Sequence, residues 1–196
     1  MVRISLGTRT MPETPPPAGQ PLRIGWLCHL IRAASAAQAA WTLALTAWWW
    51  SDAAAIEKAY GTFLKVDVSG ASSLQYGIAV AINLCSWALY AAISFCIWRQ
   101  FGAYLQGRVF TVDAAIWMRR VGTTGCAALI FSLLARHLVV IVLAFHLHAP
   151  FGALLSVPRW AGTFDALQAL FFLAVIGLAQ IHYAAAELAE DHAKIV

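Results

Sequence analysis

VGTTGCAALIFSLLARHLVVIVLAFHLH, residues 121–148, is a long apolar run that carries one formal charge, at Arg136. A helix needs about 20 apolar residues to cross the roughly 30 Å hydrocarbon layer of a membrane, so this run is long enough. Three further long uncharged runs occur in the chain. The sequence therefore predicts an all-α membrane protein whose four transmembrane helices form an antiparallel bundle, with spans at about residues 24–50, 74–98, 121–148 and 163–185.

The composition excludes an ordinary soluble domain. Of the 196 residues, 61% are apolar and 11% are charged, and the mean hydropathy is +0.71. Soluble domains are typically about 45–50% apolar and about 25% charged. The formal net charge of +4 fits basic residues placed beside anionic lipid, so we predict the lipid bilayer and not nucleic acid as the partner of these charges.

The distribution of basic residues predicts the orientation of the chain. Arginines gather before the first predicted span and between the second and the third, whereas the other two connections hold few. Because cytoplasmic loops carry the excess of Lys and Arg, both termini should be cytoplasmic. The chain then divides into a disordered, proline-rich cytoplasmic tail at 1–21, a transmembrane domain at 22–186 and an acidic cytoplasmic tail at 187–196.

Arg136 is the predicted centre of a polar cluster inside the membrane. An arginine near the bilayer centre costs about 2.5 to 3.5 kcal/mol on insertion scales, so it needs a partner or a wet cavity. Asp165 enters the fourth span from the outer side and should reach the depth of Arg136; Asn83, Thr46 and Gln168 would complete the cluster. We interpret it either as a ligand or ion site that opens outward, or as a structural pair between the third and fourth spans.

The histidines raise a redox alternative. A membrane haem of the b type needs two histidines at the same depth on facing helices. His29 and His182 match in depth at the inner ends of the first and fourth spans and are the candidate haem ligands. His146 and His148 should point to different faces of a helix, so we predict no metal site there. The leading interpretation includes no cofactor.

The connection between the second and third spans has clear local signals. Gly107 is placed to end one helix, and Thr111 is a plausible N-cap for the next, with Asp113 in its first turn. No nucleophile with a neighbouring base and no glycine-rich phosphate loop is present in the sequence. We therefore predict a protein that is not an enzyme.

Two segments resemble a known family. GRVFTVDAAIWMRRVG at 107–122 has the family's glycine, its Phe-Thr pair and a helix that ends in arginine and glycine, and AAELAEDHAKIV at 185–196 is similar to an acidic, EENDLTV-like ending. With four predicted spans, residues 22–196 resemble domain-of-unknown-function family 2975, small bacterial inner-membrane proteins. His192 and Met118 depart from the pattern. The matching positions are Gly107, Phe110, Thr111, Arg119, Gly122, Glu187, Leu188, Glu190, Asp191 and Val196.

The resemblance implies a regulatory pair at the bacterial inner membrane, because family members are often encoded beside a small helix-turn-helix regulator. Basic and acidic residues on the cytoplasmic side would clasp one another or present a docking surface; the other interpretation is positive-inside anchoring beside a solvated tail. The docking candidates are Gly107, Phe110, Thr111, Arg119, Arg120, Glu187, Glu190 and Asp191.

The leading hypothesis is a non-enzymatic inner-membrane protein with a regulatory or sensing role through a cytoplasmic partner. That partner would be a helix-turn-helix regulator, and the chain itself would form a homo-oligomer within the bilayer. Two alternatives come from other classes of protein. One is a haem- or quinone-binding redox subunit, and the other is a small oligomeric channel or carrier.

Overall fold

The computed structural model describes residues 25–64, 70–145 and 163–195, and within these ranges all the regular structure is helical. The predicted tail at 1–21 and the pair His146 and His148 lie outside the described residues. In chain order the elements are α1 (Gly25–Trp50), α2 (Ala53–Ala59), the short π-helical segment η1 (Tyr60–Leu64), α3 (Ser73–Leu105), α4 (Val112–Leu143) and α6 (Thr163–Ile195).

Local signals in the sequence account for where the long helices start. The backbone amide of Gln75 donates to the hydroxyl of Ser72, and the backbone amide of Ser72 donates to the side chain of Gln75, which forms a capping box at the start of α3. Thr111 caps α4 by accepting a hydrogen bond from the amide of Ala114 at 3.3 Å. Gly107, with φ at +76°, makes the turn between α3 and α4.

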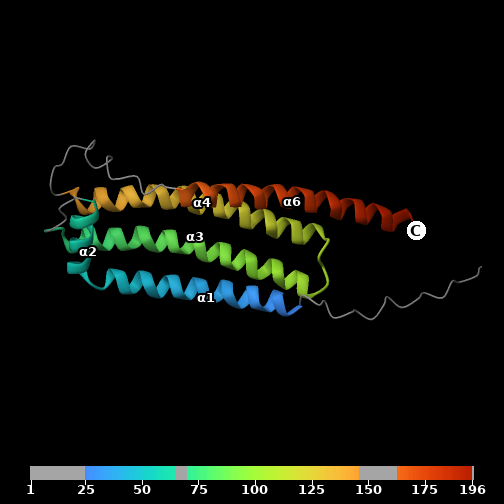
Figure 1. The fold of residues 1–196 in the computed structure, drawn as a ribbon, viewed down its shortest axis with the longest axis horizontal. Helices are drawn as coiled ribbons and strands as arrows, with labels where there is room; N and C mark the ends of the chain where they lie inside the picture. Colours follow the sequence, from blue (N-terminus) through green and yellow to red (C-terminus); the bar gives the residue numbers. More distant parts are fainter. Residues whose placement is uncertain (1–24, 65–69, 146–162, 196) are drawn as a thin grey trace, which may run out of the picture.

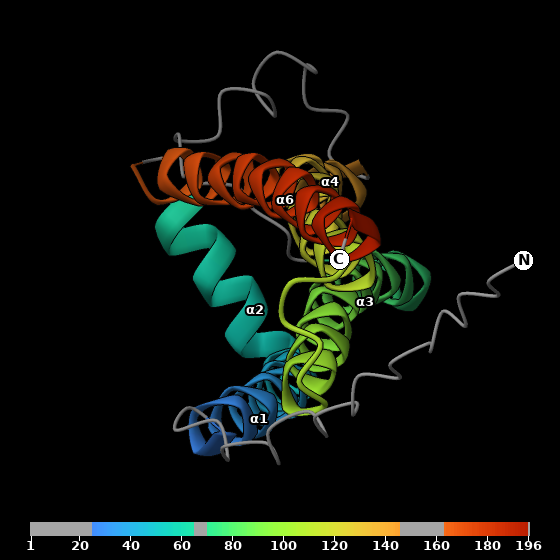
Figure 2. The same cartoon turned by 90° about the vertical axis from the view of Figure 1, so that its right-hand side faces the viewer.

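The long helices lie side by side in an open row (Figures 1 and 2). Helix α1 contacts α3, α3 contacts α4, and α4 contacts α6; α1 and α6 do not touch in the described part of the chain. The predicted antiparallel order of neighbours is present, but the row does not close into a four-helix bundle. The polar faces of the spans were also expected to point toward one another, and those of α1 and α6 do not meet in the described residues because these two helices do not touch.

Three helices are long and apolar enough to cross a membrane: α3, α4 and residues Phe164–Leu188 of α6. Helix α1 is about 39 Å long, which is also sufficient. Its several tryptophans, with Gln38 and two threonines, lower its hydropathy, although tryptophan is favoured at membrane boundaries. The structure therefore supports three spans by composition, and the fourth is a proposal.

The open row leaves large apolar side chains uncovered. Trp41 of α1 is 63% exposed and Leu170 of α6 is 64% exposed, and every long helix carries further examples. In water such a surface would drive the helices together, whereas lipid chains cover it without a hydrophobic penalty. The arrangement is thus physically consistent with an apolar solvent around the helices.

A small cap formed by α2 and η1 covers one end of the row, which we call the cap end. Ile56 of α2 is fully buried against Ala79, Val139 and Leu143 of α3 and α4. Burial beneath the cap also raises the pKa of Tyr60 to about 12. Helix α4 ends at Leu143, under this cap, and not at His148 as the predicted span did.

Candidate functional site

Helices α4 and α6 approach each other closely through two glycines. A side chain at Gly122 would collide with Ile176 and with the α6 backbone, and one at Gly125 would collide with the ring of Phe172. Ala128, one turn further along α4, is fully buried. This face of small residues leads directly to Arg136, so the packing of α4 on α6 positions the charged pair.

Arg136 of α4 and Asp165 of α6 form a two-point ion pair. Nη1 of Arg136 donates to Oδ2 of Asp165, and Nη2 donates to Oδ1, each at 3.1 Å. This bidentate geometry is the strong form of an arginine–carboxylate contact. The side chain of Asp165 is only 11% exposed, whereas that of Arg136 is 45% exposed. Asp165 also lies in the first turn of α6, where the helix dipole favours a negative charge.

Two other predicted members of the polar cluster form hydrogen bonds along their own helices. The hydroxyl of Thr46 donates to the carbonyl of Thr42, and the amide of Asn83 donates to the carbonyl of Ala79, each within its own helix. Gln168 is exposed. In the described residues α3 separates α1 from α4 and α6. Thr46 on α1 therefore does not contact Asp165 on α6. Within the described residues the structure brings Arg136 and Asp165 together and separates Thr46 from them, while the participation of Asn83 and Gln168 stays a prediction.

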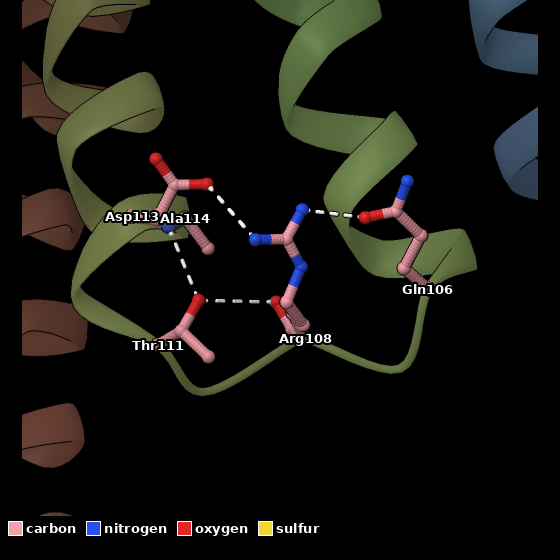
Figure 3. A network of polar contacts seen from close by, with 5 residues as sticks. All are labelled: Gln106, Arg108, Thr111, Asp113 and Ala114. Carbon is pink, nitrogen blue, oxygen red and sulfur yellow. Dashed lines mark hydrogen bonds and ion pairs between the residues drawn. The ribbon is translucent and has the colours of Figure 1, made fainter.

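The opposite end of the row, which we call the basic end, carries Arg32, Arg99, Arg108, Arg119 and Arg120. Its turn between α3 and α4 is held by a polar network (Figure 3). Arg108 contacts the carboxylate of Asp113 at 3.7 Å and donates to the side chain of Gln106. Thr111 donates to the carbonyl of Arg108 while it caps α4. Arg108 is therefore engaged within its own turn.

His182 of α6 fastens this turn to the last helix. Its Nε2 lies 2.6 Å from the carbonyl oxygen of Val109, and because a carbonyl can only accept, Nε2 carries the proton. The ring of Phe110 stacks on the imidazole at 5.5 Å between centroids. Sequence reasoning missed this role for His182, because the two contacting residues are far apart in the chain and no local pattern links them.

The two candidate haem ligands do not face each other. His29 is exposed on α1, and His182 is engaged by the turn on α6; these two helices are the outer members of the row and do not touch in the described ranges. The prediction placed the two histidines at the same depth. It did not anticipate that α3 and α4 lie between the helices that carry them. Among the described residues, no group of three or more His, Cys, Asp or Glu side chains could hold a metal ion.

The docking candidates fall on three parts of the structure: the turn between α3 and α4, helix α4, and the last turns of α6. Gly107, Phe110 and Thr111 form the fastened turn, and Arg119 and Arg120 are exposed on α4. The acidic segment predicted as a separate tail continues α6 as helix to Ile195. Its exposed carboxylate residues are Glu187, Glu190 and Asp191.

Comparisons with known proteins add no relative. No protein-family model, no curated protein and no solved structure matches the chain. The resemblance to family 2975 therefore stays a prediction.

Proposed function

We propose that the protein crosses the bacterial inner membrane four times, with both termini in the cytoplasm, and regulates a cytoplasmic partner without enzymatic chemistry. The membrane part of the proposal is supported by three helices of sufficient length and hydropathy and by the uncovered apolar surface of the row. Helix α1 is included as the fourth span, because Trp48, Trp49 and Trp50 at its end fit an interfacial belt.

The charges at the two ends support the orientation. The basic end holds five arginines, whereas Lys58 is the basic residue of the cap within the described ranges. Arg120 and Arg136 are separated by about 24 Å along α4, which is most of the about 30 Å hydrocarbon thickness. With Arg120 at the cytoplasmic headgroups, the ion pair lies close to the outer boundary, where its half-exposed arginine can reach water.

One observation supports a cytoplasmic partner protein: α6 extends well past the rest of the basic end (Figure 1). His182 is level with the turn at Val109, and the helix continues to Ile195, about 20 Å further. This projecting segment carries Glu187, Glu190 and Asp191, together with Leu188, which is 62% exposed. An acidic helix with an uncovered leucine suits a basic protein surface.

The same helix supplies a route for sensing. Asp165 begins α6 at the outer side, and the acidic segment ends α6 at the inner side. A ligand or ion that competed for Arg136 or Asp165 would release one end of the helix from α4. It could change the docking segment only by binding the released state more tightly than the paired one.

Cysteine labelling tests the orientation. In a chain without native cysteines, a cysteine at Glu190 should react with a membrane-impermeant maleimide only in inverted vesicles, and one at Ser51 only in intact spheroplasts. Labelling of both from the same side would overturn the four-span arrangement.

Charge reversal tests the partner. The triple change Glu187→Lys, Glu190→Lys and Asp191→Lys should abolish co-purification of a basic helix-turn-helix protein from native membranes. Ala185→Lys is the matched control, because it adds a positive charge at an exposed position of the same helix without removing a carboxylate. If the triple variant and the control retain the same proteins, the acidic segment is not the docking surface.

A further inference from the structure

Arginine and tryptophan side chains meet three times at the basic end. The guanidinium of Arg32 from α1 lies 4.1 Å from the ring centre of Trp98 on α3. The guanidinium groups of Arg99 from α3 and Arg120 from α4 lie 5.2 Å and 4.4 Å from the ring centre of Trp117. These separations are within the range of cation–π attraction, so the rings hold the cations in place.

Among the residues that the structure describes, no carboxylate pairs with either cation on Trp117. Two other arginines do pair with carboxylates, Arg108 with Asp113 and Arg136 with Asp165. Arg99 and Arg120 share one ring, so their guanidinium carbons are at most about 10 Å apart. Two like charges this close repel each other, and an anion bound to the N–H edge of either guanidinium would weaken that repulsion.

The shape of the arginine side chain selects the anion. A guanidinium that rests on an indole keeps its N–H edge available, and this edge matches two oxygens of a phosphate group. Phe95 meets Trp117 edge to face at 6.2 Å between centroids, which fixes the orientation of the indole. The site is therefore organised before a ligand arrives.

Apolar side chains next to the charges select a lipid over a free ion. Phe95 is 58% exposed and Ile116 is 40% exposed, on the same two helices that supply Arg99 and Arg120. An acyl chain that ran along α3 and α4 would cover such side chains, while its headgroup met the arginines at the depth expected for cytoplasmic lipid phosphates.

We propose that Arg99, Trp117 and Arg120 form a binding site for the phosphodiester headgroup of an anionic glycerophospholipid in the cytoplasmic leaflet. The proposal rests on the membrane orientation proposed above, but it concerns α3 and α4 and not the acidic end of α6. The single negative charge of the phosphodiester would offset one of the two positive charges, and the lipid would join α3 to α4 at their inner ends.

Native mass spectrometry of the full-length protein in detergent tests the site. Phosphatidylglycerol should stay bound to the wild-type protein, and phosphatidylcholine should not. Arg120→Gln should lower the affinity for phosphatidylglycerol about five-fold, the effect of one basic residue near an anionic surface. Arg119→Gln is the matched control, because it removes the same charge from the adjacent exposed position of α4, where the structure shows no ring contact.

Each further outcome decides the matter. Equal losses in the Arg119 and Arg120 variants, or full retention in Arg120→Lys, would mean diffuse charge attraction and would overturn the stacked site. Displacement of the lipid by millimolar inorganic phosphate, or equal binding of phosphatidylcholine, would also overturn it. The double variant Arg99→Gln and Arg120→Gln, checked for a single symmetric peak in size-exclusion chromatography, separates lost binding from lost folding.

If the cysteines at Glu190 and Ser51 are labelled from opposite sides while Arg120→Gln retains the lipid as the wild type does, the lipid site is rejected. The proposed function then stands. Loss of the partner in the acidic triple variant concerns only the docking segment of α6. It does not bear on the lipid site at Arg99 and Arg120.

Discussion

Arg136 and Asp165 should respond unequally to the loss of each other. Removing the arginine leaves a carboxylate that is only 11% exposed without its bidentate donor, whereas removing the carboxylate leaves an arginine that is 45% exposed and can turn toward the boundary. We expect Arg136→Gln to destabilise the protein more than Asp165→Asn, with a cost of about 1 to 3 kcal/mol, between the values for exposed and buried pairs.

Thermal unfolding in detergent, followed by tryptophan fluorescence, measures this difference. The double variant Arg136→Asp with Asp165→Arg should recover only part of the lost stability, because an arginine in the first turn of α6 opposes the helix dipole. No recovery at all would show that the costs of the single variants do not come from the pairing, and equal costs would contradict the expected asymmetry.

The charged pair was predictable from the sequence, and its polar neighbours were not. A charge inside an apolar run must find a partner, and Asp165 was the acidic residue at a matching depth. The hydroxyl of Thr46 and the side-chain amide of Asn83 need no partner on another helix. Each donates a hydrogen bond to a carbonyl of its own helix. His182 shows the opposite limit: its partner, Val109, is a backbone carbonyl that no sequence pattern distinguishes.

At the scale of the helix, the α4–α6 contact depends on the missing side chain of Gly125. A methyl group there would overlap the Phe172 ring, so Gly125→Ala should cost about 1 to 3 kcal/mol and weaken the positioning of Arg136. Gly77→Ala in α3 is the matched control, since nothing lies near its added carbon. The control should be neutral or stabilise by about 0.5 to 1 kcal/mol. Melting temperatures of the two variants check the prediction, which fails if they shift alike.

Hydropathy located the helices but not their ends. The predicted span at 74–98 corresponds to α3, which continues to Leu105, and the span at 163–185 corresponds to α6, which continues to Ile195. Hydropathy reports only the apolar part of a helix, whereas polar residues such as Gln100 extend it without any signal in that pattern. Helix α4 ends where Leu143 packs against Ile56, and these two residues are distant in the chain.

At the scale of the molecule, the order of the helices decides which residues can act together. Short connections predicted the antiparallel neighbours, but whether a row of helices closes depends on contacts between its outer members. In an apolar solvent no hydrophobic force draws α1 toward α6, so uncovered tryptophan and leucine side chains do not require closure. Polar stripes alone could not reveal this, because α1 satisfies its own hydroxyls along its length.

Disulfide trapping distinguishes the open row from a closed bundle. In a chain whose native cysteines are replaced by alanine, the pair Val109→Cys and His182→Cys should cross-link more than a pair on helices that do not touch, because the imidazole of His182 reaches the backbone of Val109. The pair His29→Cys and His182→Cys should not cross-link, because cysteines bond only when their Cα atoms lie within about 7 Å, and α1 and α6 do not touch in the described residues. Efficient cross-linking of the second pair would show that α1 and α6 are neighbours, as in a closed bundle. The two histidines would then again be candidates for facing haem ligands. Cross-linking that appears only between two chains would instead place α1 of one copy beside α6 of another, which dimer and monomer bands on a gel separate directly.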